Sequence, residues 1–372
     1  MSGEKLDRET DAISERLRMY ESTGSQARSN GGGLDNGIDI ARKLGGKISD
    51  IAGVEKLEGF NFGEFISDIF KRHSTDEVEE YFTVGTPNTI PPISSVYTRW
   101  PKPWLFTRSL LASALLYFMF SCALDWFENV NLLPGLMAMG TIAIPFSTLI
   151  FFVEVNVRRN VSLYQVMRGV LFGGIMSLIF SLLLFALPMM ESLSWLGASV
   201  AGIVEETGKL VAVVVVVDMM RYRYKLNGLL FGAAIGTGFA MFESMGYAFR
   251  ILLSGGLDAM MSNIHLRGVL SPLGHIVWTA IASAALWRVA NGKKFKFVYF
   301  KDDRFLRLFC VPVALHMLWN SGLELPFMTK YWILGAVAWL IVLALIQEGL
   351  KELRKEKEND KVASENDDQN EQ

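Results

Sequence analysis

The stretch Gly202-Ile-Val-Glu205-Glu206-Thr-Gly-Lys209-Leu-Val-Ala-Val-Val-Val-Val-Val217 places two adjacent carboxylates and a lysine in a segment that is otherwise apolar enough to cross a bilayer. One ionisable residue at the centre of a membrane helix costs about 2.5–3.5 kcal/mol on insertion scales. Three such residues within five positions therefore require polar partners from other helices, and they indicate that the charges have a function.

The composition of the remaining chain is that of a polytopic membrane protein. Hydrophobic residues make up 51% of the 372 positions and are concentrated between about 105 and 347, whereas both ends are polar. Apolar blocks of this length can span the hydrocarbon core of a cell membrane. The formal net charge of −2 provides no basic face for nucleic acid. Cys122 and Cys310 lie in apolar blocks, which excludes a secreted-type disulfide framework.

The apolar blocks predict an all-α polytopic fold with about eight transmembrane helices. The predicted spans lie near residues 105–127, 134–154, 167–188, 194–218, 227–251, 268–290, 305–323 and 330–348. Lys and Arg gather before the first span and after each even-numbered span, whereas the loops 128–133, 189–193 and 324–329 contain neither. Arg267, in the predicted loop after the fifth span, is discordant. By the positive-inside rule, both termini are predicted to be cytoplasmic.

Four consecutive parts follow from this pattern. Residues 1–56 are rich in Ser, Gly, Asn and charged residues and are predicted to be a disordered cytoplasmic N-terminus. Residues 57–99 have apolar residues at helical spacing and then a turn-rich stretch, which predicts an amphipathic helix and a linker. Residues 100–348 form the transmembrane domain, and residues 349–372 form a charged cytoplasmic tail.

Four of the predicted spans carry unusual polar residues at one common depth. Glu205 and Glu206 lie on the fourth span, Glu243 on the fifth, His275 on the sixth and His316 on the seventh. With a rise of 1.5 Å per helical residue, all five are placed roughly 10–17 Å below the outer surface. Polar residues placed at random along four helices would not be expected to share one depth. The residues are therefore predicted to meet in one chamber formed by spans four to seven.

The same helices have faces that can turn toward such a chamber. Lys209 shares a helical stripe with the two adjacent carboxylates, and Thr279 and Asn320 each follow a histidine by four residues. On the fifth span, Gly228, Gly232 and Gly236 form a surface of small residues that allows close helix packing. Each helix can therefore direct polar groups away from lipid.

Two kinds of hydrolytic chemistry suit these side chains. A buried carboxylate can take a proton from water, while imidazole N–H groups and the Asn320 amide stabilise an oxyanion. Alternatively, Glu206, Glu243, His275 and His316 are candidates to hold a divalent metal such as zinc, which would activate water. The pattern H-E-x-x-H of soluble metalloproteases is absent, so the residues leave both mechanisms open. The candidate catalytic residues are Glu205, Glu206, Glu243, His275, His316 and Asn320, supported by Lys209 and Thr279.

Four ordered motifs resemble those of the PrsW-type intramembrane proteases, a family related to the CAAX prenyl-protease and bacteriocin-processing group. The motifs are Glu205-Glu206-x-x-Lys209, Phe239-x-x-x-Glu243, His275-x-x-x-Thr279 and His316-x-x-x-Asn320, and the resemblance covers about residues 100–348. It implies a protease domain over that range, in a prokaryotic cytoplasmic membrane. It also implies cleavage of a single-pass membrane protein such as an anti-sigma factor. Because the family is described both as glutamic and as metal-dependent, the resemblance leaves the mechanism open.

Two other functions fit a membrane protein with buried charges. A proton- or ion-coupled transporter would use buried Glu and His residues to carry protons, but the paired Gly/Pro-interrupted segments typical of that class are not evident. A non-catalytic membrane sensor would instead bind a partner through residues 1–95. The motif set favours the protease.

Overall fold

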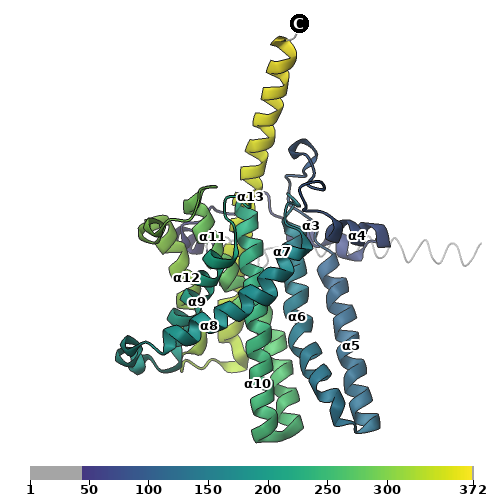
Figure 1. Ribbon diagram of the computed structural model, residues 1–372, viewed down its shortest axis with the longest axis vertical. Coiled ribbons are helices and arrows are strands. Elements are labelled where there is room, and N and C mark those ends of the chain that lie inside the picture. The colour runs from purple at the N-terminus through teal and green to yellow at the C-terminus, as the bar shows by residue number, and fades with distance from the viewer. Residues whose placement is uncertain (1–43, 371–372) are drawn as a thin grey trace, which may run out of the picture. The chain divides into compact units, whose positions relative to one another are not determined.

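The computed structural model describes residues 44–370, and in this range the regular secondary structure is entirely helical (Figure 1). The predicted all-α class is confirmed. The chain divides into two compact units, Met1–Ile48 and Ser49–Gln372, and the helices named here belong to the second. They are α3 (Phe62–Phe65), α4 (Thr75–Thr83), α5 (Leu105–Phe127), α6 (Leu133–Val155), α7 (Leu163–Arg168), α8 (Gly174–Phe185), α9 (Val200–Val216), α10 (Lys225–Leu270), α11 (His275–Ala290), α12 (Asp303–Asn320) and α13 (Thr329–Asn370).

Within the described residues, five helical stretches are long and apolar enough to cross a membrane. They are Leu105–Phe127, Val130–Val155, Leu163–Phe185, Lys225–Ala290 and Pro326–Asn366. The protein is therefore a membrane protein with several apolar helices. The predicted fourth and seventh spans are also helical, as α9 and α12, but both are short and carry charged residues. The number of crossings and the side on which each terminus lies stay predictions.

The longest helix, α10, folds back on itself at Gly256. This residue has φ 80° and ψ −174°, a backbone conformation that is essentially restricted to glycine. The two arms lie against each other, because Arg267 on the returning arm bonds to Glu243 and Ser244 on the outgoing one (Figure 1). The loop predicted between the fifth and sixth spans is therefore wrong: residues 257–270 are helical, since one glycine is enough to reverse the chain.

The small residues of α10 set its distance from α11. A side chain at Gly232 would collide with Ser283, and one at Gly236 would collide with Thr279. The two helices therefore approach as closely as their backbones allow, as the glycine pattern predicts. This contact brings His275, the first residue of α11, next to Glu243 on α10.

The start of α5 is bound by a buried carboxylate on α6. The N–H groups of Trp104 and Leu105 donate to Glu154 Oε1 at 2.7 and 2.8 Å, and the N–H of Phe106 donates to Glu154 Oε2 at 2.9 Å. The first N–H groups of a helix have no partner within the helix. Glu154 therefore satisfies three of them and fixes α5 against the end of α6. The sequence alone gave no reason to single out this residue.

The segment before α3 docks on α13. The N–H of Glu58 donates to Gln347 Oε1 at 2.6 Å, and Gln347 Nε2 donates to the carbonyl of Lys56 at 2.8 Å. The predicted disorder of residues 1–56 falls mostly outside the described residues, and within them residues 44–52 are helical. The amphipathic segment forms α3 and then a short 3-10 turn rather than one helix.

The helix α12 begins at an acidic cap. Asp302 accepts the backbone N–H of Arg304 at 2.9 Å and two guanidinium bonds from the same residue at 3.0 and 2.7 Å. These bonds favour the charged carboxylate and lower the pKa of Asp302 to about 2. The cap fixes the start of the helix that carries His316.

Candidate functional site

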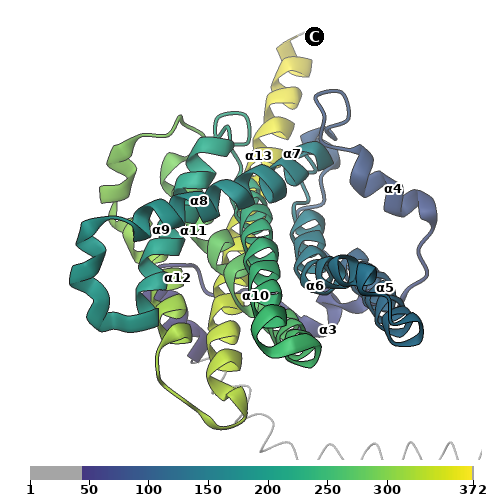
Figure 2. The ribbon, with the colours of Figure 1, turned by 60° about the horizontal axis from the view of Figure 1, so that its bottom comes forward.

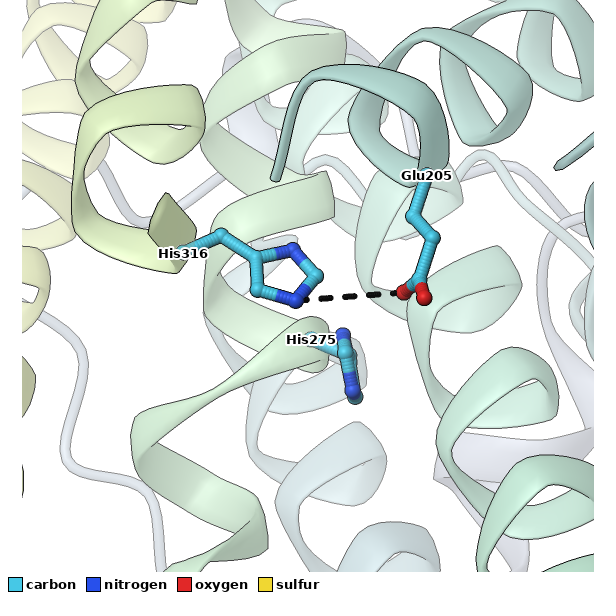
Figure 3. A group of neighbouring side chains, drawn as sticks. All are labelled: Glu205, His275 and His316. Carbon is cyan, nitrogen blue, oxygen red and sulfur yellow. Dashed lines mark ion pairs between the residues drawn. The ribbon is translucent and has the colours of Figure 1, made fainter. Parts of the chain in front are cut away.

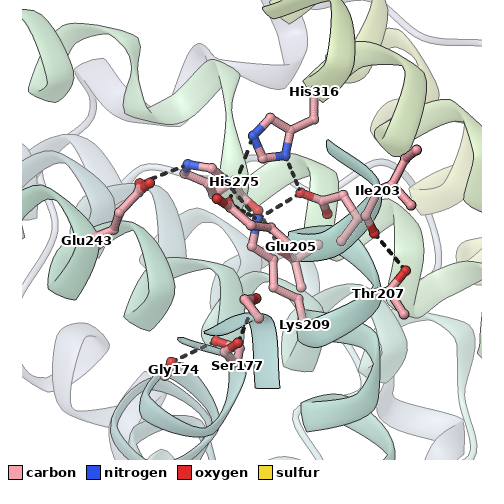
Figure 4. A network of polar contacts seen from close by, with 12 residues as sticks. Gly174, Ser177, Ile203, Glu205, Thr207, Lys209, Glu243, His275 and His316 are labelled. Atoms are coloured by element: carbon pink, nitrogen blue, oxygen red, sulfur yellow. Dashed lines mark hydrogen bonds and ion pairs between the residues drawn. The ribbon is translucent and has the colours of Figure 1, made fainter. Parts of the chain in front are cut away.

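Four helices bring ionisable side chains together inside the bundle (Figure 4). The helix α9 contributes two adjacent carboxylates and a lysine, α10 contributes a third carboxylate, and α11 and α12 contribute one histidine each. Six of the eight residues predicted from the sequence therefore meet: Glu205, Glu206, Lys209, Glu243, His275 and His316.

The most buried part of this cluster is the ion pair between Glu206 and Lys209. Lys209 Nζ donates to Glu206 Oε1 at 2.7 Å, and both side chains are fully buried. The same carboxylate oxygen lies 2.9 Å from His316 Nδ1. Opposite charges attract strongly where water is excluded, so Lys209 holds the Glu206 carboxylate in place. Because His316 Nδ1 contacts the same oxygen, the carboxylate in turn fixes the imidazole of α12 against α9.

His275 is engaged at both ring nitrogens. Lys209 Nζ lies 2.9 Å from Nδ1, and Glu243 Oε2 lies 3.1 Å from Nε2. An ammonium group can only donate a hydrogen bond, so Nδ1 is the acceptor and Nε2 carries the proton toward Glu243. One tautomer of His275 is thereby selected.

Arg267 joins the cluster from the returning arm of α10. Its guanidinium donates to Glu243 Oε2 at 2.5 Å and to Ser244 Oγ at 2.9 Å. Arg267 is not among the site residues predicted from the sequence. The sequence nevertheless marks it as unusual, because it is a basic residue that does not fit the positive-inside pattern.

Glu205, His275 and His316 form a group with the donor atoms of a metal site (Figure 3). One ligand atom from each residue lies within 4.8 Å of the others, and His316 Nε2 is 3.9 Å from Glu205 Oε2. This Glu205 oxygen is buried and has no hydrogen-bond partner among the described residues. A buried oxygen of this kind has unused capacity to bind a cation or water.

The surroundings of this group fit a divalent cation such as zinc. Two imidazole nitrogens and a carboxylate oxygen are common zinc ligands. Each histidine also has a carboxylate on a ring nitrogen, Glu206 for His316 and Glu243 for His275, which is how metal-binding histidines are usually oriented. With all three carboxylates ionised, as metal binding would require, they outnumber the two basic side chains, Lys209 and Arg267, by one charge.

Binding one ion requires the group to close slightly. Atoms that each lie about 2 Å from one ion can be at most about 4 Å apart. Lys209 must also move away from Nδ1 of His275 if that nitrogen is to bind the ion. The sequence proposes Glu206 and Glu243 as ligand candidates, whereas the structure groups Glu205 with the histidines and puts the other two carboxylates behind them.

Aromatic side chains enclose the polar atoms. Trp278 is stacked on His316 with ring centroids 4.6 Å apart, and Phe239 lies 5.0 Å from the ring of His275. Lys209 Nζ lies 4.0 Å from the centre of the Phe239 ring. Apolar walls exclude water and strengthen the charge interactions inside them.

The two remaining predicted residues lie outside the cluster. The hydroxyl of Thr279 donates to the backbone carbonyl of His275 at 2.7 Å, within α11. Asn320 is the last residue of α12, and in the described part of the chain it makes no hydrogen bond with the cluster. Thr279 therefore supports the first turn of α11, and no contact supports the oxyanion role predicted for Asn320.

A family model described as "PrsW family intramembrane metalloprotease" matches residues 158–346 of the chain. No curated protein and no solved structure matches the chain. The matched range contains all four sequence motifs and every residue of the cluster.

Proposed function

Because the chain belongs to the PrsW family of intramembrane metalloproteases, and is therefore an intramembrane protease, we propose that it hydrolyses its substrate at the group formed by Glu205, His275 and His316. The observation that carries this proposal is the meeting of these side chains, from three helices, inside an apolar bundle. Ionisable residues at membrane depth mark functional sites by default. Family membership also favours proteolysis over the transporter considered from the sequence.

Glu205, His275 and His316 would hold a divalent cation such as zinc. Such an ion, when bound, acts as a Lewis acid and lowers the pKa of water. The carboxylates of Glu206 and Glu243 each hold one nitrogen of an imidazole and so keep its orientation. The second nitrogen of His316 is directed toward Glu205, and that of His275 becomes available once Lys209 moves away. Both carboxylates thus serve as positioning residues.

Glu205 is the carboxylate best suited to take a proton from the attacking water. Glu206 is enclosed by its ion pair with Lys209, and Glu243 is bonded to Arg267. Glu205, in contrast, lies 3.7 Å from Lys209 Nζ rather than 2.7 Å, and its side chain is 13% exposed, whereas that of Glu206 is fully buried. This role fits a glutamic or a metal-assisted mechanism, because a carboxylate offers two oxygens.

We expect the substrate to be a single-pass membrane protein, and an anti-sigma factor is the kind that the family resemblance suggests. The apolar walls around the cluster support a substrate that arrives from the bilayer, since a soluble peptide would have to be transferred out of water. The enzyme would act in a prokaryotic cell membrane.

The test is cleavage of a fluorescent single-pass reporter by the full-length protein in nanodiscs. Glu205→Gln keeps the shape of the side chain and removes its basicity, and should lower the cleavage rate by about 10²–10⁴-fold. Glu191→Gln alters an exposed glutamate outside the cluster and should leave the rate unchanged. Equal rates for Glu205→Gln and the wild type would place the reaction elsewhere.

A further inference from the structure

The helices α8 and α10 touch at two glycines and then separate. A side chain at Gly174 would lie 2.6 Å from Cα of Gly238, so the backbones are in contact at this point. Beyond it, α8 crosses α10 obliquely and runs away from it (Figure 2). Two helices that cross in contact and then diverge leave a wedge-shaped space between them.

This space is a groove of about 370 Å³, called here the α8–α10 groove. Its walls are mostly apolar, with Leu178, Leu182 and Phe185 on α8 and Phe239 and Phe242 on α10, and Ser181, Tyr247 and Arg250 also line it. The outer wall faces away from the bundle, because the side chain of Leu182 is 68% exposed. In a membrane, exposed leucine and phenylalanine face lipid. The groove therefore opens toward the hydrocarbon region.

The inner end of the groove reaches two carboxylates of the cluster. Glu205 and Glu243 both line it, and their side chains are 13% and 19% exposed, whereas Glu206 is fully buried. A smaller cavity of 220 Å³ on the other side of the Glu243–Arg267 ion pair reaches His275 but not Glu205. Of these two spaces, the α8–α10 groove is the one that leads to the proposed proton acceptor.

We propose that the α8–α10 groove receives an apolar transmembrane segment of the substrate, which enters sideways from the lipid between α8 and α10 and presents its peptide bond to Glu205. This inference rests on the proposed function of the cluster. The occupant follows from the lining: apolar walls open to lipid suit leucine-rich or alanine-rich side chains, and the carboxylates lie only at the inner end. Gly246 leaves room for the segment, because a Cβ there would meet no atom within 4 Å.

Photo-crosslinking tests the proposal without depending on cleavage. Full-length Glu205→Gln protein in nanodiscs carries benzoylphenylalanine at position 182, and the probe is a biotinylated single-pass peptide with an Ala/Leu span of about 20 residues. We expect crosslinks severalfold stronger than from position 111, where Leu111 is 71% exposed on α5, far along the chain from the groove. Position 266, in the smaller cavity, should give no more than position 111.

A wedge variant gives a second readout. Gly246→Trp fills the groove and should abolish the crosslink from position 182. Gly322→Trp is the matched control, since Gly322 also has open space around its Cβ and does not line the groove. Crosslinks of equal strength from positions 182 and 111, a dominant crosslink from position 266, or no effect of Gly246→Trp would each overturn the groove. If the crosslinks follow the expected pattern but the protein with its native Glu205 does not cleave the single-pass reporter, the groove would stand and the proposed function would be contradicted.

Discussion

The Nζ atom of Lys209 lies 2.9 Å from Nδ1 of His275, so a buried ammonium group on α9 faces an imidazole at the start of α11. The same ammonium group binds Glu206 at 2.7 Å and lies 3.7 Å from Glu205. One cation therefore balances two carboxylates and engages the His275 nitrogen that accepts hydrogen bonds. Lys209 therefore connects Glu206, which orients His316, with Glu205 and His275 of the proposed metal-binding group.

Replacing Lys209 by methionine should destabilise the protein strongly. The change keeps the length of the side chain but leaves Glu206 buried without a countercharge, and breaking a buried ion pair in this way costs about 3–5 kcal/mol. The measurement is reversible unfolding of the purified protein in mixed micelles. The double variant Glu206→Gln/Lys209→Met removes both charges and should regain most of the lost stability. A single variant as stable as the wild type would show that the ion pair contributes little.

Metal content should distinguish the proposed ligands from the residues that orient them. Glu205→Gln and His316→Ala each remove a ligand and should lose bound zinc after dialysis against a fixed free concentration. Glu243→Gln removes only a carboxylate behind His275, so its zinc affinity should fall by about 10–100-fold. The check is elemental analysis together with chelator competition. Unchanged affinity in Glu205→Gln would remove Glu205 from the ligand set, and a greater loss in Glu243→Gln would exchange the two roles.

The membership of the site could be predicted largely from the sequence, because its residues are costly exceptions in apolar segments. Helical rise alone predicts that Glu205, Glu243, His275 and His316 lie at one depth. The division of roles between Glu205 and Glu206 could not be predicted. Adjacent helical residues point about 100° apart, and only the packing of α9 against α12 shows which one faces His316 Nδ1.

Residues whose partners are distant in sequence escaped prediction. Glu154 binds N–H groups about 50 positions earlier in the chain, and no local pattern marks a carboxylate that caps another helix. The hydrophobic pattern predicts a loop at Arg267, because the reversal of α10 depends on one residue with positive φ, Gly256, rather than on a recognisable turn sequence. Both errors have one cause: hydrophobic periodicity identifies helices but not how they pack.

Loss of the carboxylate at position 154 should destabilise the junction between α5 and α6. In Glu154→Leu, the N–H groups of Trp104, Leu105 and Phe106 lose their acceptor, and each unsatisfied buried group costs about 1–3 kcal/mol. Glu154→Gln can keep the oxygen that accepts two of these bonds and should lose less. Thermal unfolding in micelles should therefore rank wild type, Gln and Leu in decreasing order of stability. Equal stability of the two variants would mean that charge, rather than the number of bonds, governs this junction.

The reversal of α10 should depend on glycine at position 256. Alanine there would have to adopt φ 80° and ψ −174°, which costs about 1–3 kcal/mol for a residue with a side chain. We expect Gly256→Ala to lower stability by that amount, and to lower the cleavage rate further, because Arg267 on the returning arm would move relative to Glu243. Gly246→Ala, in the regular part of the same helix with open space around its Cβ, should be neutral or slightly stabilising. If both variants gave equal unfolding temperatures, the left-handed conformation at Gly256 would not be what aligns the two arms.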